Sequence, residues 1–380
     1  MKLRCDRSAL VDKLAVLSRG VSTRMALPVL SGILLQATED RLDLYSTDME
    51  ISIKAFMPVV IDEPGDIVVP ARLFSDVVRN LVGEEVRVES GAGEGGVVQI
   101  TAGKARFSLN SWAASDFPQM STFDVRGGFA VPREPFLETL GKVARAASRD
   151  ETRPILTGVL VIIGGGNLRM VATDSYRLSV KQSVVEGGPA EEVQAIVPVK
   201  ALGEVARLAT AADRAAIDVA ITENQALFGF GEVIIATRLI DGVFPNYKQL
   251  LPDTYDHQFE LDKDELLGVA RRVGLLAQKN APLRLRFAPA DEEGPSRLVV
   301  RAVTQDVGQA EEQVEVDYAG EAFEIGFNHA YLIDGVEAVD GDRIRLKLTS
   351  PLRPGLISGV GAEDEAHEFV YLIMPIRLSN

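Results

Sequence analysis

The sequence predicts an α+β protein made of three tandem domains of like fold, each with two helices and antiparallel sheets. Three observations support this fold class. The chain has 380 residues, enough for two or three domains. Two blocks of sequence recur at a spacing of 126 residues. Helix-type and strand-type patterns alternate in the same order in each copy. A repeat of this length is a whole domain rather than a solenoid unit of about 20 to 50 residues.

The repeat is clearest in residues 154–178. PVLSGILL at residues 28–35 corresponds to PILTGVLV at residues 154–161. LDLYSTD at 42–48 corresponds to LRMVATD at 168–174. Phe-Pro pairs at 117–118 and 244–245 close the two copies, and a third, fainter copy keeps the order of elements. We expect domains at residues 1–125, 126–254 and 255–380, with boundaries in stretches rich in Gly, Pro or charge.

Two helices are expected in the first copy. The first spans residues 8–20, with Ser8 as its N-cap, and the second spans residues 71–82, opened by Pro70. Their apolar residues recur at helical spacing and are Leu10, Leu14 and Leu17 in the first helix, and Leu73, Val77 and Leu81 in the second. Strands are expected within residues 30–60 and 86–109.

The later copies repeat this order. Helices are expected at residues 134–149 and 199–214 in the second copy. In the third copy they are expected at 262–279, capped by Asp262, and at 328–340. Strands are expected within residues 156–185 and 283–303, and the glycines at 164–166 are expected to form a hairpin turn between two strands.

Composition excludes several classes of protein. Hydrophobic residues make up 46% and charged residues 25% of the chain, as in an ordinary globular protein. No apolar run is long enough for a signal peptide or a membrane span, so we expect a cytoplasmic protein with no membrane partner. The lone Cys5 has no partner for an internal disulfide, and His257, His329 and His367 are widely spaced, so we expect no metal and no cofactor.

The net charge of −15 argues against nucleic-acid binding only if charge is evenly spread. The six expected helices hold 14 Lys and Arg against 12 Asp and Glu, whereas the rest of the chain holds 26 against 43. This partition fits a ring that encloses DNA through phosphate contacts without reading bases. The alternative is that Lys and Arg are simply good helix formers.

Tandem copies joined head to tail leave one unused joining surface at each end of the chain. A heterologous contact between such ends closes into a ring or grows into a filament. The sequence leaves the number of domains in the ring open.

The repeated Asp48 and Asp174 allow an enzymatic alternative, a multi-domain hydrolase that uses two carboxylates. The third copy has Val303-Thr304 at the aligned place, so a turn at a strand end is the favoured interpretation. We assign no catalytic residues and expect a non-catalytic protein.

Four segments resemble the beta sliding clamp of bacterial DNA polymerase III: VATDSYRLSV (171–180), RLIDGVFPNYKQLLP (238–252), IGFNHAYL (325–332) and YLIMPIRL (371–378). The resemblance covers essentially the whole chain. It implies that two chains close head to tail into a ring around double-stranded DNA, without base specificity. It also implies a processivity factor that tethers the polymerase alpha subunit, the clamp loader and other replication and repair proteins.

The resemblance also implies functional residues. A peptide-binding pocket would be formed by Arg153, Leu156, Thr173, Ser175, Tyr176, Arg177, Leu178, Pro245, Leu250, Asn328, Tyr331, Met374, Pro375, Ile376 and Arg377. DNA would be contacted by Arg24, Arg72, Arg149 and Lys200. The dimer interface would join Phe107 and Leu109 of one chain to Leu275 and Leu276 of the other.

This chain departs from the family pattern at three places. Ser175-Tyr176 stands where the family often has Gly-His, Gln249 where it often has a basic residue, and Ser379-Asn380 extends the C-terminus. Peptide preference therefore stays open. A peptide-binding scaffold that never encircles DNA is the remaining alternative.

Overall fold

The computed structural model describes residues 1–22, 27–91, 96–119, 123–252, 254–277, 282–291, 294–305, 307–361 and 368–378. The chain divides into two compact units: Met1–Arg133 with Lys200–Leu239, and Glu134–Val199 with Ile240–Asn380. The middle copy of the repeat is shared between the two units.

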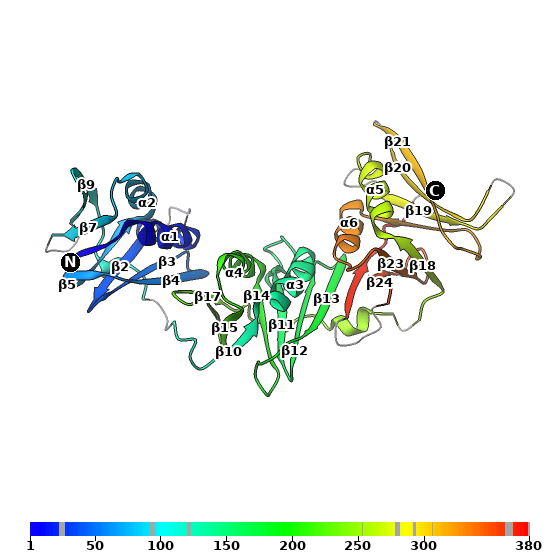
Figure 1. Ribbon diagram of the computed structural model, residues 1–380. Coiled ribbons are helices and arrows are strands. Elements are labelled where there is room, and N and C mark those ends of the chain that lie inside the picture. Colours follow the sequence, from blue (N-terminus) through cyan, green and yellow to red (C-terminus); the bar gives the residue numbers. More distant parts are fainter. Residues whose placement is uncertain are drawn as a thin grey trace. The chain divides into compact units, whose positions relative to one another are not determined.

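The first unit contains two antiparallel sheets and the helices α1 (Arg7–Leu17), α2 (Ala71–Asn80) and most of α4 (Val199–Ala211). Helices α1 and α2 lie side by side over the strands of the first copy (Figure 1). The smaller sheet has the order β5 (Val60–Glu63), β1 (Lys2–Asp6), β7 (Glu85–Ser90), β8 (Val97–Ala102), β9 (Ala105–Asn110). The larger has the order β10 (Phe129–Pro132), β15 (Ala216–Ile221), β16 (Gln225–Gly229), β17 (Val233–Arg238), β4 (Ile51–Pro58), β3 (Arg41–Thr47), β2 (Gly32–Thr38), β6 (Gly65–Pro70).

The second unit repeats this plan with α3 (Arg133–Val143), α5 (Lys263–Gly274) and α6 (His329–Glu337). Its larger sheet has the order β14 (Val193–Pro198), β11 (Gly158–Gly164), β12 (Asn167–Thr173), β13 (Arg177–Val184), β25 (Phe369–Ile373), β24 (Gly355–Gly359), β23 (Arg343–Leu348), β18 (His257–Asp262). Its smaller sheet has the order β21 (Gly308–Glu315), β20 (Arg297–Thr304), β19 (Leu283–Ala288), β22 (Phe323–Phe327).

Each large sheet is built from two consecutive copies of the repeat. In the first unit β4 of the first copy pairs antiparallel with β17 of the second. In the second unit β13 of the second copy pairs antiparallel with β25 of the third. Backbone hydrogen bonds therefore join neighbouring copies directly, and the joint is as continuous as the sheet itself.

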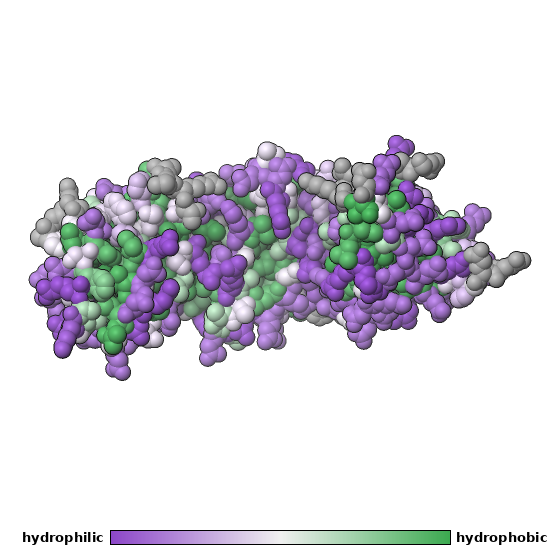
Figure 2. All heavy atoms as spheres, turned by 90° about the horizontal axis from the view of Figure 1, so that it is seen from above, coloured by the Kyte–Doolittle hydropathy of each residue, from purple (hydrophilic) through white to green (hydrophobic). Residues whose placement is uncertain are grey.

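Apolar side chains after each copy pack on its sheet. Phe117 lies in a cluster with Leu34 and Tyr45 in the first unit. Phe244 and Tyr247 occupy the corresponding place on the larger sheet of the second unit. These contacts explain why the Phe-Pro pair recurs in the sequence. One face of the molecule is largely hydrophilic with apolar residues in separate patches (Figure 2), as expected for a chain with this many charged residues.

The expected helices are all present, with two corrections to the first copy. The N-cap of α1 is Asp6 rather than Ser8, because the Asp6 carboxylate accepts the backbone N–H of Ala9 at 2.7 Å and its charge suits the helix N-terminus. Leu73 is 56% exposed, because α2 buries the face that carries Ala71, Phe74 and Val78.

The later helices follow their expected caps but are shorter than expected. Asp262 caps α5 by accepting from Glu265 N at 2.8 Å. The α-helix α3 ends at Val143 and continues as a 3-10 turn through Ala146, and α4 ends at Ala211. The glycines at 164–166 form the predicted hairpin turn, with Gly165 and Gly166 at φ of 57° and 77°, a backbone region that glycine adopts at little cost.

The packing of α6 on β25 predicts opposite effects for two glycine substitutions. A Cβ at Gly335 would lie 2.5 Å from the Tyr371 ring, whereas a Cβ at Gly141 in α3 meets nothing within 4 Å. We expect Gly335→Ala to lower the free energy of unfolding by about 1–3 kcal/mol and Gly141→Ala to raise it by about 0.4–1 kcal/mol. Calorimetric unfolding measures both, and equal effects would contradict this packing.

Candidate peptide-binding pocket

The second unit contains a cavity of about 590 Å³ where the second and third copies join. The lining side chains come from the turn between β12 and β13, the segment after Tyr247, the loop between β23 and β24, and the end of β25. Most are apolar or uncharged. They are Thr173, Ser175, Arg177, Leu178, Gln249, Leu250, Leu251, Pro252, Thr254, Thr349, Leu352, Arg353, Pro354, Leu372 and Met374.

The floor of the pocket is set by strand pairing. Leu178 of β13 lies opposite Leu372 of β25, and both side chains are buried. The pairing continues past β25, where Met374 N donates to the carbonyl oxygen of Tyr176 at 2.8 Å. The rim is exposed: Leu250 is 48%, Leu352 59% and Met374 39% accessible. A buried apolar floor with an exposed apolar rim suits a short apolar peptide.

The equivalent junction in the first unit has smaller and more polar side chains. Ser52 of β4 lies opposite Ala236 of β17, where the second unit has Leu178 and Leu372. Arg238 N donates to the carbonyl oxygen of Glu50 at 3.2 Å, so Arg238 takes the place of Met374. The backbone is the same, but the side chains that make the second junction apolar are absent from the first.

The repeated aspartates each cap their own turn. Asp174 Oδ1 accepts the backbone N–H groups of Tyr176 and Arg177 at 2.9 and 3.0 Å. Asp48 Oδ1 accepts those of Glu50 and Ile51 at 3.0 and 2.8 Å. The residue after each aspartate, Met49 or Ser175, has φ of 76° or 79°. The interpretation of both aspartates as strand-end turns is therefore confirmed, and the catalytic interpretation loses its basis.

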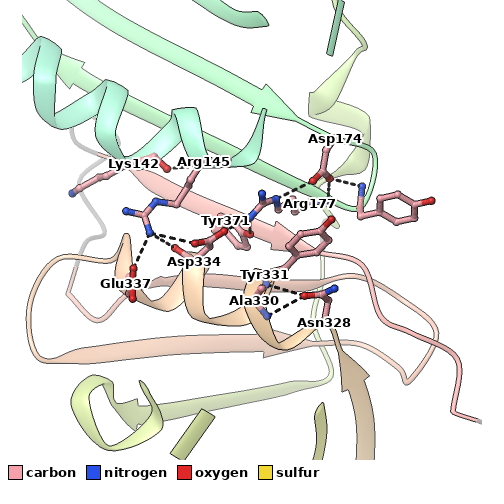
Figure 3. Close-up of polar contacts among 12 residues, drawn as sticks. Lys142, Arg145, Asp174, Arg177, Asn328, Ala330, Tyr331, Asp334, Glu337 and Tyr371 are labelled. Carbon is pink, nitrogen blue, oxygen red and sulfur yellow. Dashed lines mark hydrogen bonds and ion pairs between the residues drawn. The ribbon is translucent and has the colours of Figure 1, made fainter. Parts of the chain in front are cut away.

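The second copy differs from the first at the last position of this turn. Ile51 is buried in the first copy, whereas Arg177 takes that position in the second. The Arg177 side chain is only 10% exposed. Its Nε donates to Asp174 at 3.0 Å, its Nη1 pairs with Asp334 of α6 and approaches the Tyr371 hydroxyl at 3.4 Å, and its guanidinium lies 4.2 Å from the centre of the Tyr331 ring (Figure 3).

Burial and neighbouring groups shift the pKa values of Arg177, Tyr331 and Tyr371. Burial disfavours the charged form of Arg177, but Tyr371, Asp334 and Asp174 outweigh burial and raise the pKa of the guanidinium. Burial raises the pKa of the Tyr371 hydroxyl, and burial followed by the Asp174 charge raises that of Tyr331. At physiological pH a charged arginine therefore binds two carboxylates between neutral phenols.

Further ion pairs extend from Asp334 along α6. Arg145, just after α3, donates to Glu337 at 3.1 Å and to the Asp334 carbonyl oxygen at 3.2 Å (Figure 3). Arg271 of α5 donates to Glu337 at 2.6 Å. The hydrogen bonds from Arg271 and then Arg145 lower the pKa of the Glu337 carboxyl. Through these ion pairs, Arg145 of the second copy and Arg271 of α5 both contact Glu337 of α6.

The pocket residues expected from the sequence fall into two groups. Six line the cavity: Thr173, Ser175, Arg177, Leu178, Leu250 and Met374. The other nine lie outside the lining. Tyr176 is 60% exposed, Leu156 is buried and Pro245 is exposed. Arg153 donates to Ser175 at 3.1 Å, Asn328 caps α6 and Tyr331 contacts Arg177. Pro375, Ile376 and Arg377 follow β25, with Ile376 N bonded to the Gly326 carbonyl oxygen.

Sequence reasoning missed the part of the pocket that comes from the loop between β23 and β24. Thr349, Leu352, Arg353 and Pro354 line the cavity, and none was expected there. An exposed leucine in a turn rich in proline was a usable local signal. Nothing local placed that turn beside Leu178, because the two segments are far apart in the chain.

The expected DNA-binding residues are exposed where the structure describes them. Arg72 is near the start of α2, Lys200 is near the start of α4 and Arg149 follows the 3-10 turn after α3. Arg24 lies outside the described residues. Asp150, beside Arg149, accepts from Thr152 Oγ1 at 2.6 Å and Arg153 Nε at 3.1 Å, and these bonds lower the pKa of its carboxyl. Its charge is therefore partly compensated.

The expected interface residues lie near the ends of the small sheets. Phe107 is 42% exposed on β9, the edge strand of its sheet, and Leu109 is half-buried on the same strand. In the second unit Leu275 is 84% exposed just after α5, and Leu276 is half-buried. Among the described strands β9 is the edge of its sheet, and an exposed phenylalanine there is accessible to another chain.

Metal and thiol chemistry find no support in the residues that the structure describes. No group of three or more His, Cys, Asp or Glu among them could hold a metal ion. Burial raises the pKa of the Cys5 thiol to about 12, so this thiol is not a nucleophile at neutral pH. No helix of the described chain is long and apolar enough to cross a membrane.

A repeated α+β fold, with sheets continuous between consecutive copies and a cavity at the β13–β25 junction, defines a protein with the DNA clamp fold. The chain belongs to the DNA polymerase III beta subunit family: residues 1–121 match its N-terminal domain, 130–246 its central domain and 248–377 its C-terminal domain. It is thus a DNA sliding clamp by family, a processivity factor rather than an enzyme.

Known proteins match the chain over its full length. The beta sliding clamp of Streptomyces coelicolor is 34% identical, with 100% of both chains covered. The DNA polymerase sliding clamp of Caulobacter crescentus has a TM-score of 0.90 at 32% identity, with 100% of both chains covered. A Pseudomonas aeruginosa sliding clamp bound to griselimycin has a TM-score of 0.87 at 29% identity, again with 100% of both chains covered.

The Arg177 cluster predicts a large difference between two substitutions. Arg177→Ala leaves Asp174 without its buried cation, so we expect it to lower the free energy of unfolding by about 3–5 kcal/mol. Tyr371→Phe keeps the ring and loses one long hydrogen bond, so we expect a loss of about 1 kcal/mol or less. Urea unfolding measures both. A small effect of Arg177→Ala would show that the cluster is not a structural joint.

Proposed function

We propose that two copies of this chain close head to tail into a ring around duplex DNA, and that the pocket of the second unit tethers partner proteins. The partners are the DNA polymerase III alpha subunit, the clamp loader and other replication and repair proteins. The observation that carries this proposal is the pocket at the β13–β25 junction, where a buried apolar floor meets an exposed apolar rim. Eight of the fifteen described lining residues are apolar, and none of the fifteen is acidic.

The tethering proposal is supported by the division between floor and rim. Buried Leu178 and Leu372 give a fixed floor. Exposed Leu250, Leu352 and Met374 have apolar area that a ligand would remove from water, and each such side chain contributes about 1.5–3 kcal/mol when fully buried. Of the expected pocket residues, those outside the lining are proposed to act at the edge of the bound peptide or through Arg177.

Ring closure is supported by the charge of the two free sheet edges. The end of the first unit exposes Phe107 beside Arg106 on β9, and nearby Lys104 adds a second cation. In the second unit the edge strand β21 carries Glu311, Glu312 and Glu315. Glu312 is already bound by Arg272 and Glu311 lies 3.9 Å from Arg301, so Glu315 is the main acidic group offered to a partner. A basic edge and an acidic edge complement each other in a heterologous contact. Phe107 and Leu109 would then pack on Leu275 and Leu276 of the other chain.

DNA contact is supported by the exposure of Arg72, Arg149 and Lys200. Each would bind phosphate without reading bases, and we propose Arg24 for the same role. We further propose domain boundaries at residues 1–125, 126–254 and 255–380, and a cytoplasmic location, which suits a DNA replication factor.

Removing the pocket rim should abolish tethering. We expect Leu250→Ser combined with Leu352→Ser to weaken peptide binding by more than about 10-fold and to reduce stimulation of DNA synthesis in proportion. Deletion of residues 374–380 should abolish stimulation and leave the dimer intact. Val243→Ser, at a residue 88% exposed and outside the pocket lining, is the matched control. Full stimulation by the double variant would refute the pocket assignment.

Closure around DNA should produce topological retention. After loading, we expect the wild-type protein to remain on nicked circular DNA in high salt and to be released when the circle is cut. Leu275→Asp should prevent retention and give monomers in sedimentation, whereas Val243→Asp, at a similarly exposed residue, should not. A dimer that binds peptide but is never retained on circles would favour the non-encircling scaffold.

A further inference from the structure

The rim of the pocket carries a cation that is not committed to any acidic side chain among the described residues. The lining contains two arginines, Arg177 and Arg353. Arg177 is bound by Asp174 and Asp334. Arg353 lies exposed in the loop between β23 and β24, and among the residues that the structure describes its side chain has no ion-pair partner. Its positive charge is therefore directed at solvent or at a ligand.

The backbone holds Arg353 in a defined place. Arg353 N donates to the carbonyl oxygen of Ser350 at 3.1 Å, which closes a β-turn with Pro351 at its second position, the position that proline favours. Pro354 follows directly and fixes another backbone angle. Leu352, 59% exposed in the same turn, is part of the apolar rim. The turn that contains Pro351 therefore places the apolar side chain of Leu352 and the guanidinium of Arg353 next to each other at the pocket rim.

The charge of the pocket differs from that of the chain. The whole protein has a net charge of −15, which repels acidic ligands at long range. Among the residues that the structure describes, the pocket lining has no Asp or Glu, and Gln249 within it is neutral. A carboxylate that reaches the rim would therefore meet Arg353 without a competing acid among the described lining residues, and guanidinium binds carboxylate in a two-point geometry.

We propose that Arg353 is a specificity-determining residue of the pocket, which makes it select peptides that carry a carboxylate beside their apolar anchors. This inference rests on the proposed peptide-binding function. The carboxylate belongs either to an Asp or Glu side chain or to the C-terminus of the peptide, and both present the same chemistry to Arg353.

The test uses fluorescein-labelled octapeptides with Leu and Phe as anchors and one variable residue between them, either Asp or Asn. Each is made with an amidated and with a free C-terminus, so that the two sources of carboxylate are separated. Binding to the full-length protein is measured by fluorescence anisotropy at 50 and 500 mM salt. The variants are Arg353→Gln, the double variant Arg353→Gln with Gln249→Arg, and Arg207→Gln, an exposed arginine of α4 outside the pocket lining.

The wild type and the Arg207→Gln variant should bind the carboxylate peptide about 2- to 5-fold more tightly than the neutral one at low salt, with less preference at high salt. Arg353→Gln should remove the preference without changing affinity for the neutral amidated peptide. Gln249→Arg should restore it by returning a cation to the lining. The inference is supported if Arg353→Gln removes the preference for Asp over Asn or the preference for a free over an amidated C-terminus.

Two results would overturn it. Equal binding of charged and neutral peptides by the wild type would show that the pocket does not select carboxylates. A preference that persists in Arg353→Gln would assign selection to another residue. Failure of every peptide to bind the wild type is a different result, because it would overturn the proposed peptide-binding function itself.

Discussion

Antiparallel pairing between strands of consecutive copies is the interaction on which the rest of this structure depends. β4 pairs with β17 in one unit and β13 pairs with β25 in the other. Because sheet hydrogen bonds do not depend on side chains, the same joint forms twice from different sequences. The side chains on the paired strands are then free to diverge. One junction carries the smaller side chains of Ser52 and Ala236, and the other carries Leu178 and Leu372 of the pocket floor.

The divergence is concentrated in a short stretch of sequence. The turn after Thr47 and the turn after Thr173 share the same aspartate cap and the same positive φ. Beyond the turn, Ile51-Ser52 in the first copy corresponds to Arg177-Leu178 in the second. Leu178 makes the floor apolar, and Arg177 ties that floor to Asp334 of α6. Moving an arginine and two carboxylates out of water costs free energy that offsets much of their attraction. The main effect of Arg177 is therefore to hold β13 in a fixed position relative to α6, rather than to add net stability.

Much of the fold could be predicted from local sequence. The six helices, the Asp262 cap, the glycine hairpin and the aspartate turns depend on neighbouring residues, and a periodic pattern reports them directly. The exposed side of α2 was mistaken because Leu73 and Phe74 are adjacent and both apolar, so spacing alone did not settle which one faces the core. Ser8 was predicted as the N-cap of α1 instead of Asp6, because Asp6 is also the last residue of β1 and no loop separates the strand from the helix.

The pocket was predictable only in part. Leu178, Leu250 and Met374 were expected through a family resemblance, whereas Leu352 and Arg353 were not. Strand partners such as β13 and β25 are separated by nearly half the chain, and no local pattern encodes their pairing. The β23–β24 loop reaches the pocket because β24 pairs with β25. Leu352 and Arg353 reach the pocket because β24 pairs with β25 and β25 pairs with β13. The sequence around these two residues does not indicate either pairing.

We propose that the chain forms one apolar peptide site because Leu178, Leu372 and Met374 replace Ser52, Ala236 and Arg238. Isothermal titration of the full-length protein with one of the Leu- and Phe-anchored peptides tests it most directly, through the number of peptides bound per chain. We expect one peptide per chain, and no binding by the variant in which Leu250 and Leu352 are replaced by serine. Two equivalent peptides per chain would contradict it.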